Sequence, residues 1–311
     1  MGIIKAICIS REKGTAKVPV LQGVFKENWG LEGDAHAGRW HRQISLLSVE
    51  QIEAFKKRGG NVKFGDFGEN LAVSGFDFAK LPVGTLLGSG DVLLEITQIG
   101  KACHNHCAIY QAVGDCIMPR EGVFARVLHG GTLKPGDELK RIPRTGKRPY
   151  QAAVITLSDR GSKGLREDKS GPVLVARLEK AGFDVVETLL LPDGREPLQK
   201  ELCRLADQRQ VDLILTTGGT GFSPRDLTPE ATLAVADRLA PGIAEAIRAA
   251  SLQITPRAML SRAASVIRKS TLIINLPGSP KACNESLDVI LDTLPHGLDV
   301  LRQDVTDCGR N

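Results

Sequence analysis

Residues 216–230, TTGGTGFSPRDLTPE, join an apolar strand to a helix through a glycine-rich loop. The run before them, VDLIL at 211–215, is typical of a buried strand in a parallel sheet. After the loop, Thr228 is a favoured N-cap and Pro229 a favoured first residue of a helix. Ligands of α/β domains bind at such strand-to-helix loops. The stretch therefore predicts an α/β domain with a binding site at the carboxyl edge of its sheet.

The glycines of this loop are suited to binding anions. Gly218, Gly219 and Gly221 leave backbone N–H groups uncovered, as a nest for phosphate oxygens requires. Asp226 adds a carboxylate of the kind that holds Mg²⁺. A tight turn without a ligand is the alternative that the loop alone leaves open.

The composition favours a two-domain protein with a small anionic ligand. A chain of 311 residues is long enough for two domains with separate cores. The net charge of +5 is mild and aromatic residues make up 4%, so we expect no nucleic-acid partner. The N-terminal residues are too short and polar for a signal peptide, and no apolar run has the length of a membrane span, so we expect a cytoplasmic protein without a membrane partner. Seven cysteines, an odd number, argue against a disulfide framework.

The two halves of the chain differ in periodicity. Residues 1–142 alternate short apolar runs with glycine-rich turns, which predicts a β-rich domain with one helix at 48–58. The short basic stretch 143–149 carries two prolines and is the expected linker. Strands and helices then alternate, which predicts a three-layer α/β/α domain with a mostly parallel sheet over 150–311. Its expected strands are 152–157, 184–189, 211–215 and 271–275, and its expected helices are 170–180, 197–207, 228–239 and one from 282 onward.

Other loops of this second half also follow apolar strands, so we expect them at the same sheet edge. They contribute, in chain order, Asp159 leading toward Ser170, then Asp193, and then NLPGSPK at 275–281. Gly278, Ser279 and Lys281 combine free amides, a hydroxyl and an ammonium at a helix start, which suits an anion. Plain turns are the alternative for the last two loops.

These motifs, with RDLTPEAT at 225–232 and LSR at 260–262, closely resemble the molybdopterin adenylyltransferases of the MogA and MoaB type over about residues 151–303. The resemblance implies transfer of AMP from Mg-ATP to the terminal phosphate of molybdopterin, with release of pyrophosphate. It assigns Asp193 and Asp226 as the catalytic carboxylates linked to magnesium. It also implies a trimer formed through this domain.

The resemblance further implies a set of ligand-binding residues. The expected phosphate cradle is Gly218, Gly219, Thr220 and Gly221, with Ser223, Pro277 and Gly278 in the same set. Ser279 and Lys281 are expected to hold the molybdopterin phosphate, while Asp159 and Ser170 either bind ligand or cap helices. Arg225 pairs either with phosphate or with Asp226, and both interpretations stay open.

The first half resembles the MOSC domain, the module found at the C-terminus of molybdenum cofactor sulfurases, over about residues 3–141. The motifs are GLEGDAHAG at 30–38, QISLL at 43–47, GDFGENL at 65–71 and GGTLKPGD at 130–137. The resemblance implies a β-barrel-like domain that binds a molybdenum or tungsten cofactor or carries sulfur to it.

Cys103 aligns with the cysteine that carries this role. Lys101 and two nearby histidines would supply the positive surroundings that ionise a thiol. The run CHNHC at 103–107, together with Cys116, also offers ligands for zinc or an iron–sulfur cluster. A sulfur-handling or pterin-contacting thiol, a metal site formed by Cys103, Cys107 and Cys116, and plain packing all stay open, and the metal site is not the favoured one.

Two further pairs in this half are candidate ligand-binding residues. Asp34 and His36 lie in a glycine-rich segment that forms either the mouth of the barrel or a polar turn with a solvated histidine. Glu69 and Asn70 either bind a ligand or belong to a turn.

Both resemblances concern one pterin, so the sequence predicts a fusion protein of molybdenum cofactor biosynthesis. A MOSC domain at 1–142 would be joined through 143–149 to an adenylyltransferase domain at 150–311, with other molybdenum-cofactor proteins as partners. A tethered second site would raise the effective concentration of a labile intermediate. The alternatives are a pterin-binding scaffold or storage protein without turnover, and a nucleotidyltransferase that acts on another phosphorylated substrate.

Overall fold

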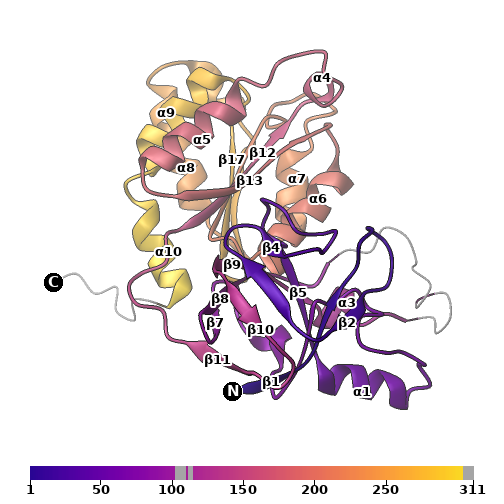
Figure 1. Cartoon of the computed structure of the whole chain (residues 1–311). Coiled ribbons are helices and arrows are strands. Elements are labelled where there is room, and N and C mark those ends of the chain that lie inside the picture. Colours follow the sequence, from indigo (N-terminus) through magenta and orange to yellow (C-terminus); the bar gives the residue numbers. More distant parts are fainter. Residues whose placement is uncertain (102–109, 111–114, 304–311) are drawn as a thin grey trace. The chain divides into compact units, whose positions relative to one another are not determined.

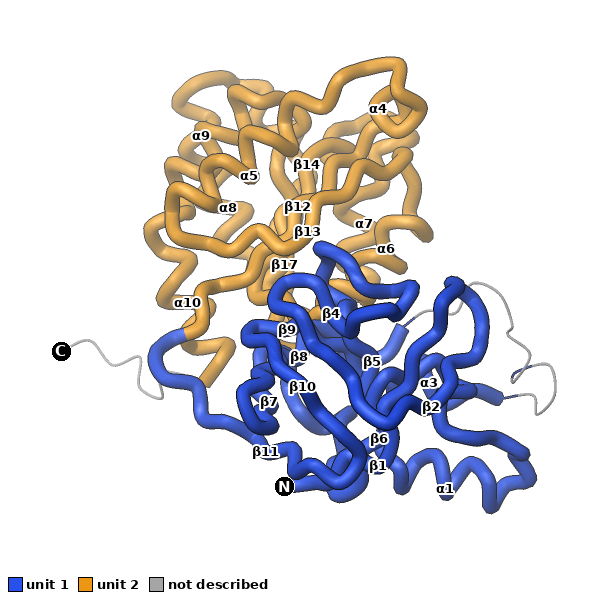
Figure 2. Tube along the Cα trace, viewed as in Figure 1, with its two compact units in different colours: residues 1–147 blue, residues 148–311 orange. Residues whose placement is uncertain are grey.

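The computed structural model describes residues 1–101, 110 and 115–303. The chain forms two compact units, Met1–Lys147 and Arg148–Asn311 (Figures 1 and 2). Among the described residues, no helix combines the length and the apolar character that crossing a bilayer requires.

The first unit is built mainly of strands. They are β1 (Gly2–Ile9), β2 (Val18–Val20), β3 (Gly23–Lys26), β4 (Gly30–Leu31), β5 (Ile44–Ser48), β6 (Leu71–Ser74), β7 (Leu86–Ser89), β8 (Val92–Ile99), β9 (Val123–His129), β10 (Gly131–Leu133) and β11 (Glu138–Ile142). The helical segments are α1 (Val49–Lys57), the 3-10 turn η1 (Phe78–Lys80) and α3 (Met118–Glu121).

Seven of these strands close into a barrel. The main sheet has the order β11-β7-β8-β9-β5-β6-β1-β2, and β11 also pairs with β1, where Gly2 lies opposite Leu139. Apolar side chains of these strands, among them Ile4, Leu46 and Leu94, pack into one core from which water is excluded. A small separate sheet contains β10, β3 and β4. The β-rich fold expected for this half is therefore confirmed as a barrel.

Helix α1 forms a second, smaller core beside the barrel. Ile52 and Phe55, three residues apart and so on one helix face, are both buried. The helix ends at Lys57, shortly before Gly59, whose φ of +98° lies in the left-handed region that favours glycine. The helix expected at 48–58 is thus present, with one residue fewer at each end.

The second unit alternates strands and helices. Its strands are β12 (Gln151–Leu157), β13 (Asp184–Leu191), β14 (Leu213–Thr217), β15 (Arg238–Leu239), β16 (Ser265–Arg268) and β17 (Thr271–Leu276). Its helices are α4 (Asp159–Ser162), α5 (Ser170–Lys180), α6 (Arg195–Cys203), α7 (Thr228–Ala234), α8 (Pro241–Leu252), α9 (Pro280–Ile290) and α10 (Leu294–Arg302). Two further segments are the π-helical turn η2 (Arg204–Gln208) and the 3-10 turn η3 (Pro256–Leu260).

Helices cover both faces of the sheet β13-β12-β14-β17-β16-β15. Along β12, Ala152 and Val154 join the apolar cluster of α5, α8, α9 and α10, whereas Ala153 and Ile155 join the cluster of α6 and α7. Since successive strand residues point to opposite faces, the unit has three layers, as Figure 1 shows. The expected three-layer fold with a mostly parallel sheet is confirmed.

The segment after residue 227 differs from expectation. Helix α7 ends at Ala234, because Arg238 and Leu239 form β15 and pair with β16 instead of continuing the helix. The hydroxyl of Thr228 does not cap this helix, since it donates to the carbonyl oxygen of Gly218 at 2.9 Å. Helix α8 was not expected at all, although Pro241 at its first position is a known start signal.

Candidate functional site

Four loops of the second unit meet at one edge of its sheet. Strands β13, β12, β14 and β17 are neighbours and run parallel, so the loops that follow them lie at their common carboxyl edge. This confirms the expectation that these loops share one edge, which is where ligands of such sheets bind.

The loop after β14 depends on two glycines with positive φ. Gly218 has φ +99°, and a Cβ atom on it would lie 2.5 Å from the carbonyl oxygen of Leu157. Gly219 has φ +65°, and its Cβ would lie 2.4 Å from the hydroxyl oxygen of Thr228. Any other residue would therefore be strained by the positive φ and would displace the backbone of Leu157 or the side chain of Thr228, so these two positions favour glycine.

Arg262 holds the same loop through hydrogen bonds to its backbone. Its Nε donates to the carbonyl oxygen of Gly221 at 2.7 Å, and its Nη2 donates to the carbonyl oxygen of Asp226. Its Nη1 pairs with the carboxylate of Glu230, and its backbone N–H donates to the carbonyl of Thr220 at 3.0 Å. Sequence reasoning gave Arg262 a place in a motif but no role, so the structure adds it as a residue that positions the site.

Asp226 shapes the end of the loop with its carboxylate. Its Oδ2 accepts the backbone N–H of Ser223 at 3.0 Å, and its own N–H donates to the carbonyl of Ser223 at 2.9 Å. The residue is half-buried, so part of it remains accessible to solvent.

Asp159 and Asp193 are brought together from two loops. The N–H of Asp159 donates to Asp193 Oδ2, and the N–H of Asp193 donates to Asp159 Oδ1, both at 3.1 Å. Arg225 reaches this pair, with its Nη1 3.1 Å from Asp159 Oδ2. Its partner is therefore Asp159 and not Asp226, which corrects the second interpretation of Arg225, because the loop turns its guanidinium toward the first β–α loop. The side chain of Arg225 is 77% exposed, so an anion can still reach it.

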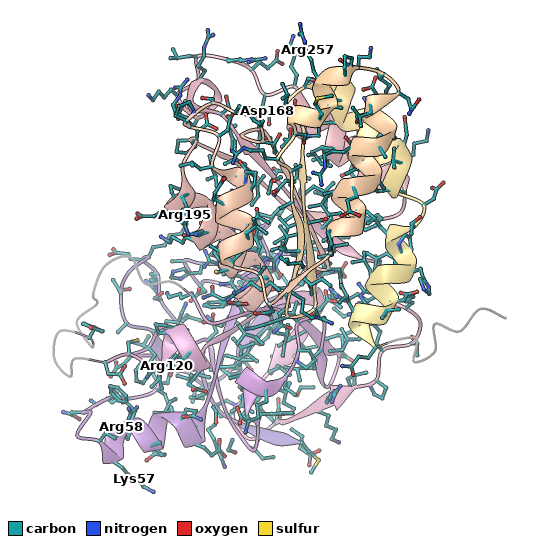
Figure 3. All side chains as sticks on the ribbon, turned by 180° about the vertical axis from the view of Figure 1, so that it is seen from behind. Lys57, Arg58, Arg120, Asp168, Arg195 and Arg257 are labelled. Carbon is teal, nitrogen blue, oxygen red and sulfur yellow. The ribbon has the colours of Figure 1, made fainter. Side chains whose placement is uncertain are left out.

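The loop after β17 packs on its neighbours. The Ser170 hydroxyl donates to the carbonyl of Gly278 at 2.9 Å, and the Thr217 hydroxyl donates to the carbonyl of Pro277 at 2.7 Å. A Cβ on Gly278 would lie 3.4 Å from Cα of Gly218, so the two glycine loops approach each other closely. Asp168, labelled in Figure 3, accepts the N–H of Ser170 at 3.0 Å. Ser170 therefore joins two loops, and Asp168 accepts N–H groups of the first turn of α5.

Ser279 and Lys281 start helix α9. The Ser279 hydroxyl oxygen accepts the N–H of Ala282 at 3.2 Å and so caps the helix. The Lys281 ammonium lies 3.7 Å from the carboxylate of Glu285 and is 83% exposed. An exposed pair of this kind is weak, so Lys281 is available to an anionic ligand.

Asn275 connects the sheet beneath these loops. Its side-chain N–H groups donate to the hydroxyls of Thr216 at 2.9 Å and Thr232 at 2.8 Å, and its Oδ1 accepts the N–H of Ala264 at 3.2 Å. Asn275 is fully buried. This network was not anticipated, because nothing in the sequence shows that these four residues are neighbours.

In the first unit, Asp34 lies in a buried ion pair. Its Oδ2 bonds the ammonium of Lys17 and accepts the N–H of Ser10 at 3.0 Å, and its Oδ1 accepts the N–H of His36 at 3.0 Å. Burial opposes ionisation, but the hydrogen bonds from His36, Lys17 and Ser10 together lower the pKa of the Asp34 carboxyl. Asp34 is therefore buried and ion-paired, whereas His36 is half-buried.

Glu69 and Asn70 are also inside this unit. Glu69 Oε1 accepts the N–H of Gly65 at 2.6 Å, while its Oε2 is buried and has no hydrogen-bond partner among the described residues. Burial raises the pKa of Glu69 to about 7. Burial, with the nearby Glu69 carboxylate, also raises the pKa of the Cys8 thiol to about 12. Asn70 bonds Ser45 and the carbonyl of Cys8, so it has a structural role.

The cysteines predicted to handle sulfur or bind a metal fall largely outside the described residues. Cys103 and Cys107 both lie there, whereas Cys116 is buried. Asp115, just before it, pairs with Arg58 at 3.2 Å and Arg120 at 3.1 Å, and Figure 3 labels both arginines. In the part of the chain that the structure describes, no three or more histidine, cysteine, aspartate or glutamate side chains gather as a metal site.

Comparisons with known proteins match both units. The family model "Probable molybdopterin binding domain" matches residues 153–296, and the model "MOSC domain" matches residues 33–140. A molybdopterin adenylyltransferase of Haemophilus influenzae is 48% identical over 141 residues, which are 45% of this chain and 72% of that protein. One of Helicobacter pylori is 41% identical over 150 residues, 48% of this chain and 85% of that protein. The crystal structure of MoaB from Thermus thermophilus is 44% identical, with coverage of 50% of this chain and 97% of that one and a TM-score of 0.48.

Proposed function

Because the chain belongs to the molybdopterin adenylyltransferase family and also carries a MOSC domain, we propose that its second unit transfers AMP from Mg-ATP to the terminal phosphate of molybdopterin. An oxygen of that phosphate attacks the α-phosphorus of ATP, and the bond from this phosphorus to the oxygen of the leaving pyrophosphate breaks. The products are molybdopterin joined to AMP, and pyrophosphate. The observation that carries the proposal is 48% identity to a protein named as this enzyme.

Transfer between phosphates requires a protein mainly to position two polyanions and to stabilise the charge that develops between them. The backbone of the loop from Gly218 to Gly221, which is free of bulky side chains, is suited to hold phosphate oxygens. Arg225 is exposed beside it and can donate charge-assisted hydrogen bonds. Ser223 and Thr220 complete the cradle in this proposal.

The carboxylates at this edge fit magnesium. Mg²⁺ is held by one or two carboxylates together with substrate phosphates and water, so a larger group of protein ligands is not required. Asp193 and Asp226 supply hard oxygen donors and are each half-buried at the carboxyl edge. When bound, the ion would neutralise phosphate charge.

The start of helix α9 is proposed to hold the phosphate of molybdopterin. Pro277 and Gly278 place this loop against the glycine loop, and Ser279 begins the helix, whose N-terminus favours an anion. Lys281 is exposed and weakly paired, so its ammonium can turn to a phosphate oxygen. Asp159 would act through Arg225 and Asp193.

For the first unit we propose that it binds the molybdenum or tungsten cofactor or hands sulfur to it through Cys103. Trapping a persulfide on Cys103 supports a sulfur carrier. Stoichiometric zinc or iron that is lost on changing Cys107 would instead favour a metal site.

The decisive experiment incubates the full chain with molybdopterin and Mg-ATP and measures AMP attached to the pterin and released pyrophosphate. Asp226→Asn should abolish transfer and leave the fold intact, because the amide oxygen can still accept the N–H of Ser223. The matched control is Asp237→Asn, whose carboxylate accepts a backbone N–H of Lys269 before β17, away from the carboxyl edge. The control should keep full activity.

Other outcomes separate the alternatives. Binding of both substrates without pyrophosphate release indicates a scaffold or storage protein. Pyrophosphate release with a different phosphorylated acceptor indicates another nucleotidyltransferase. A trimer is proposed from the family resemblance, and light scattering at several protein concentrations tests it.

A further inference from the structure

Aromatic side chains are scarce in the second unit. Residues 148–311 contain Tyr150, Phe183 and Phe222 and no other phenylalanine, tyrosine or tryptophan. Tyr150 and Phe183 pack together with ring centroids 5.4 Å apart, in the apolar cluster beneath α5 and α9. Phe222 has a different environment, since it is 68% exposed.

The backbone on both sides of Phe222 is fixed. The carbonyl oxygen of Gly221, before it, accepts a hydrogen bond from Nε of Arg262 at 2.7 Å. Ser223, after it, donates its N–H to the carboxylate of Asp226 at 3.0 Å and accepts the N–H of Asp226. A single exposed apolar side chain is ordinary by itself. Phe222 differs because its backbone is positioned by the same residues that shape the phosphate cradle, so its ring starts from a fixed point beside that cradle.

The position of the ring suits a ligand that carries both a phosphate and a flat ring. Phe222 is three residues from Gly219, so their Cα atoms are at most about 11 Å apart. Both proposed substrates have such a form, because ATP joins adenine to phosphates through ribose and molybdopterin joins a pterin to one phosphate.

We infer that the ring of Phe222 stacks on the heteroaromatic ring of a substrate whose phosphates lie in the loop from Gly218 to Gly221. The inference rests on the proposed function, since that function supplies two ligands of this kind. Stacking of a base on an aromatic side chain tolerates different bases, because each has a π-face. Phe222 thus favours ligands that carry a planar ring, and the glycine loop favours ligands that carry phosphate.

The test measures affinities by calorimetry with the full chain and magnesium. The probes are a non-reactive ATP analogue with a methylene group between the α- and β-phosphates, molybdopterin, and inorganic tripolyphosphate, which has no ring. Phe222→Ala should weaken binding of one ring-bearing ligand by about 5- to 150-fold, the range found when a stacking side chain is removed. The affinity for tripolyphosphate should stay within twofold. The ligand whose affinity falls identifies the ring.

Two further variants define what the ring contributes. Phe222→Tyr keeps a flat ring and should restore the affinity, whereas Phe222→Leu keeps apolar area without a π-face and should not. Leu239→Ala, which removes a side chain 64% exposed in β15, is the matched control and should change nothing.

Three results would overturn the inference. One is unchanged affinity for both ring-bearing ligands, and another is an equal loss for tripolyphosphate, which would indicate a distorted loop. The third is a changed oligomeric state with unchanged affinities, which would place the ring against a second copy of the chain. Failure of the unaltered protein to transfer AMP would count against the proposed function alone, because ring-dependent binding of the analogue would still stand.

Discussion

Replacing Arg262 with alanine should loosen the loop that carries Asp226 and Phe222. The side chain of Arg262 donates to the carbonyl oxygens of Gly221 and Asp226 and pairs with Glu230, so one residue holds three points of the segment 218–230. In the described part of the chain, no other group donates a hydrogen bond to the carbonyl oxygen of Gly221 or of Asp226.

The magnitude follows from these three contacts. A hydrogen bond with a charged donor contributes about 1.5–3 kcal/mol, and water can replace part of it because the Arg262 side chain is 33% exposed. The pair with Glu230, itself 41% exposed, contributes at most about 1 kcal/mol. We therefore expect Arg262→Ala to lower the free energy of unfolding of the second unit by about 2–4 kcal/mol. A displacement of the loop by about 1 Å should also lower kcat/KM for AMP transfer by roughly 10²-fold.

The assay combines urea denaturation followed by circular dichroism with hydrogen exchange at single amides. The N–H groups of Ser223 and Asp226 should exchange faster in the variant, because the hydrogen bonds that protect them open more often. Arg262→Lys is the matched control for charge. It keeps the cation but cannot reproduce the planar fork that reaches two carbonyls, so it should recover only a small part of both losses.

The reasoning would be refuted by a variant that unfolds within about 0.5 kcal/mol of the original, keeps slow exchange at both amides and turns over at the same rate. Such a result would mean that the glycines and Asp226 determine the loop without Arg262.

Two further predictions concern stability. Burial raises the pKa of Glu69 to about 7, above its value of 4.5 as a free side chain, so the folded state binds this proton more tightly than the unfolded chain does. The free energy of unfolding of the first unit should therefore fall by at most about 3 kcal/mol as pH rises from 4.5 to 7, which the fluorescence of Trp29 and Trp40 can follow. Glu69→Gln should abolish this slope. Asn275→Ala removes the partner of two buried threonine hydroxyls and one backbone N–H, so it should lower the free energy of unfolding by about 3 kcal/mol in urea denaturation. The control Asn284→Ala removes a part-buried hydrogen bond to Arg177 and should lower it by less than about 1 kcal/mol. Equal losses in the two variants would contradict the network described around Asn275.

Local signals allowed much of the fold to be predicted. Helix α5 has the bounds expected for it, Ser170 to Lys180, because its apolar spacing and its start and stop residues agree. Helix α7 was expected to be five residues longer, because Arg238 and Leu239 have no local signal for the strand they form with β16. Pairing with a distant strand overrode the local helical pattern at this point.

The same division holds for the site. The glycines at 218 and 219 could be predicted to form a loop, since positive φ is a local requirement. The partner of Arg225 could not, because Asp159 is 66 residues away in sequence while Asp226 is adjacent. Arg262 likewise acts on Gly221 across 41 residues. Pairings of this kind depend on the completed sheet and carry no signature in the sequence.

The three carboxylates at the sheet edge limit how this site can change during evolution. Asp159, Asp193 and Asp226 each accept a backbone N–H of a loop at the site, so each side chain determines the loop shape as well as the local charge. A substitution that adjusts the charge for a new substrate therefore also alters the backbone around it. Asparagine, which keeps an acceptor oxygen, is the replacement that separates the two effects. Adaptation to a different ligand would therefore proceed more readily through exposed positions such as Phe222 and Lys281, whose side chains support no backbone bond among those described.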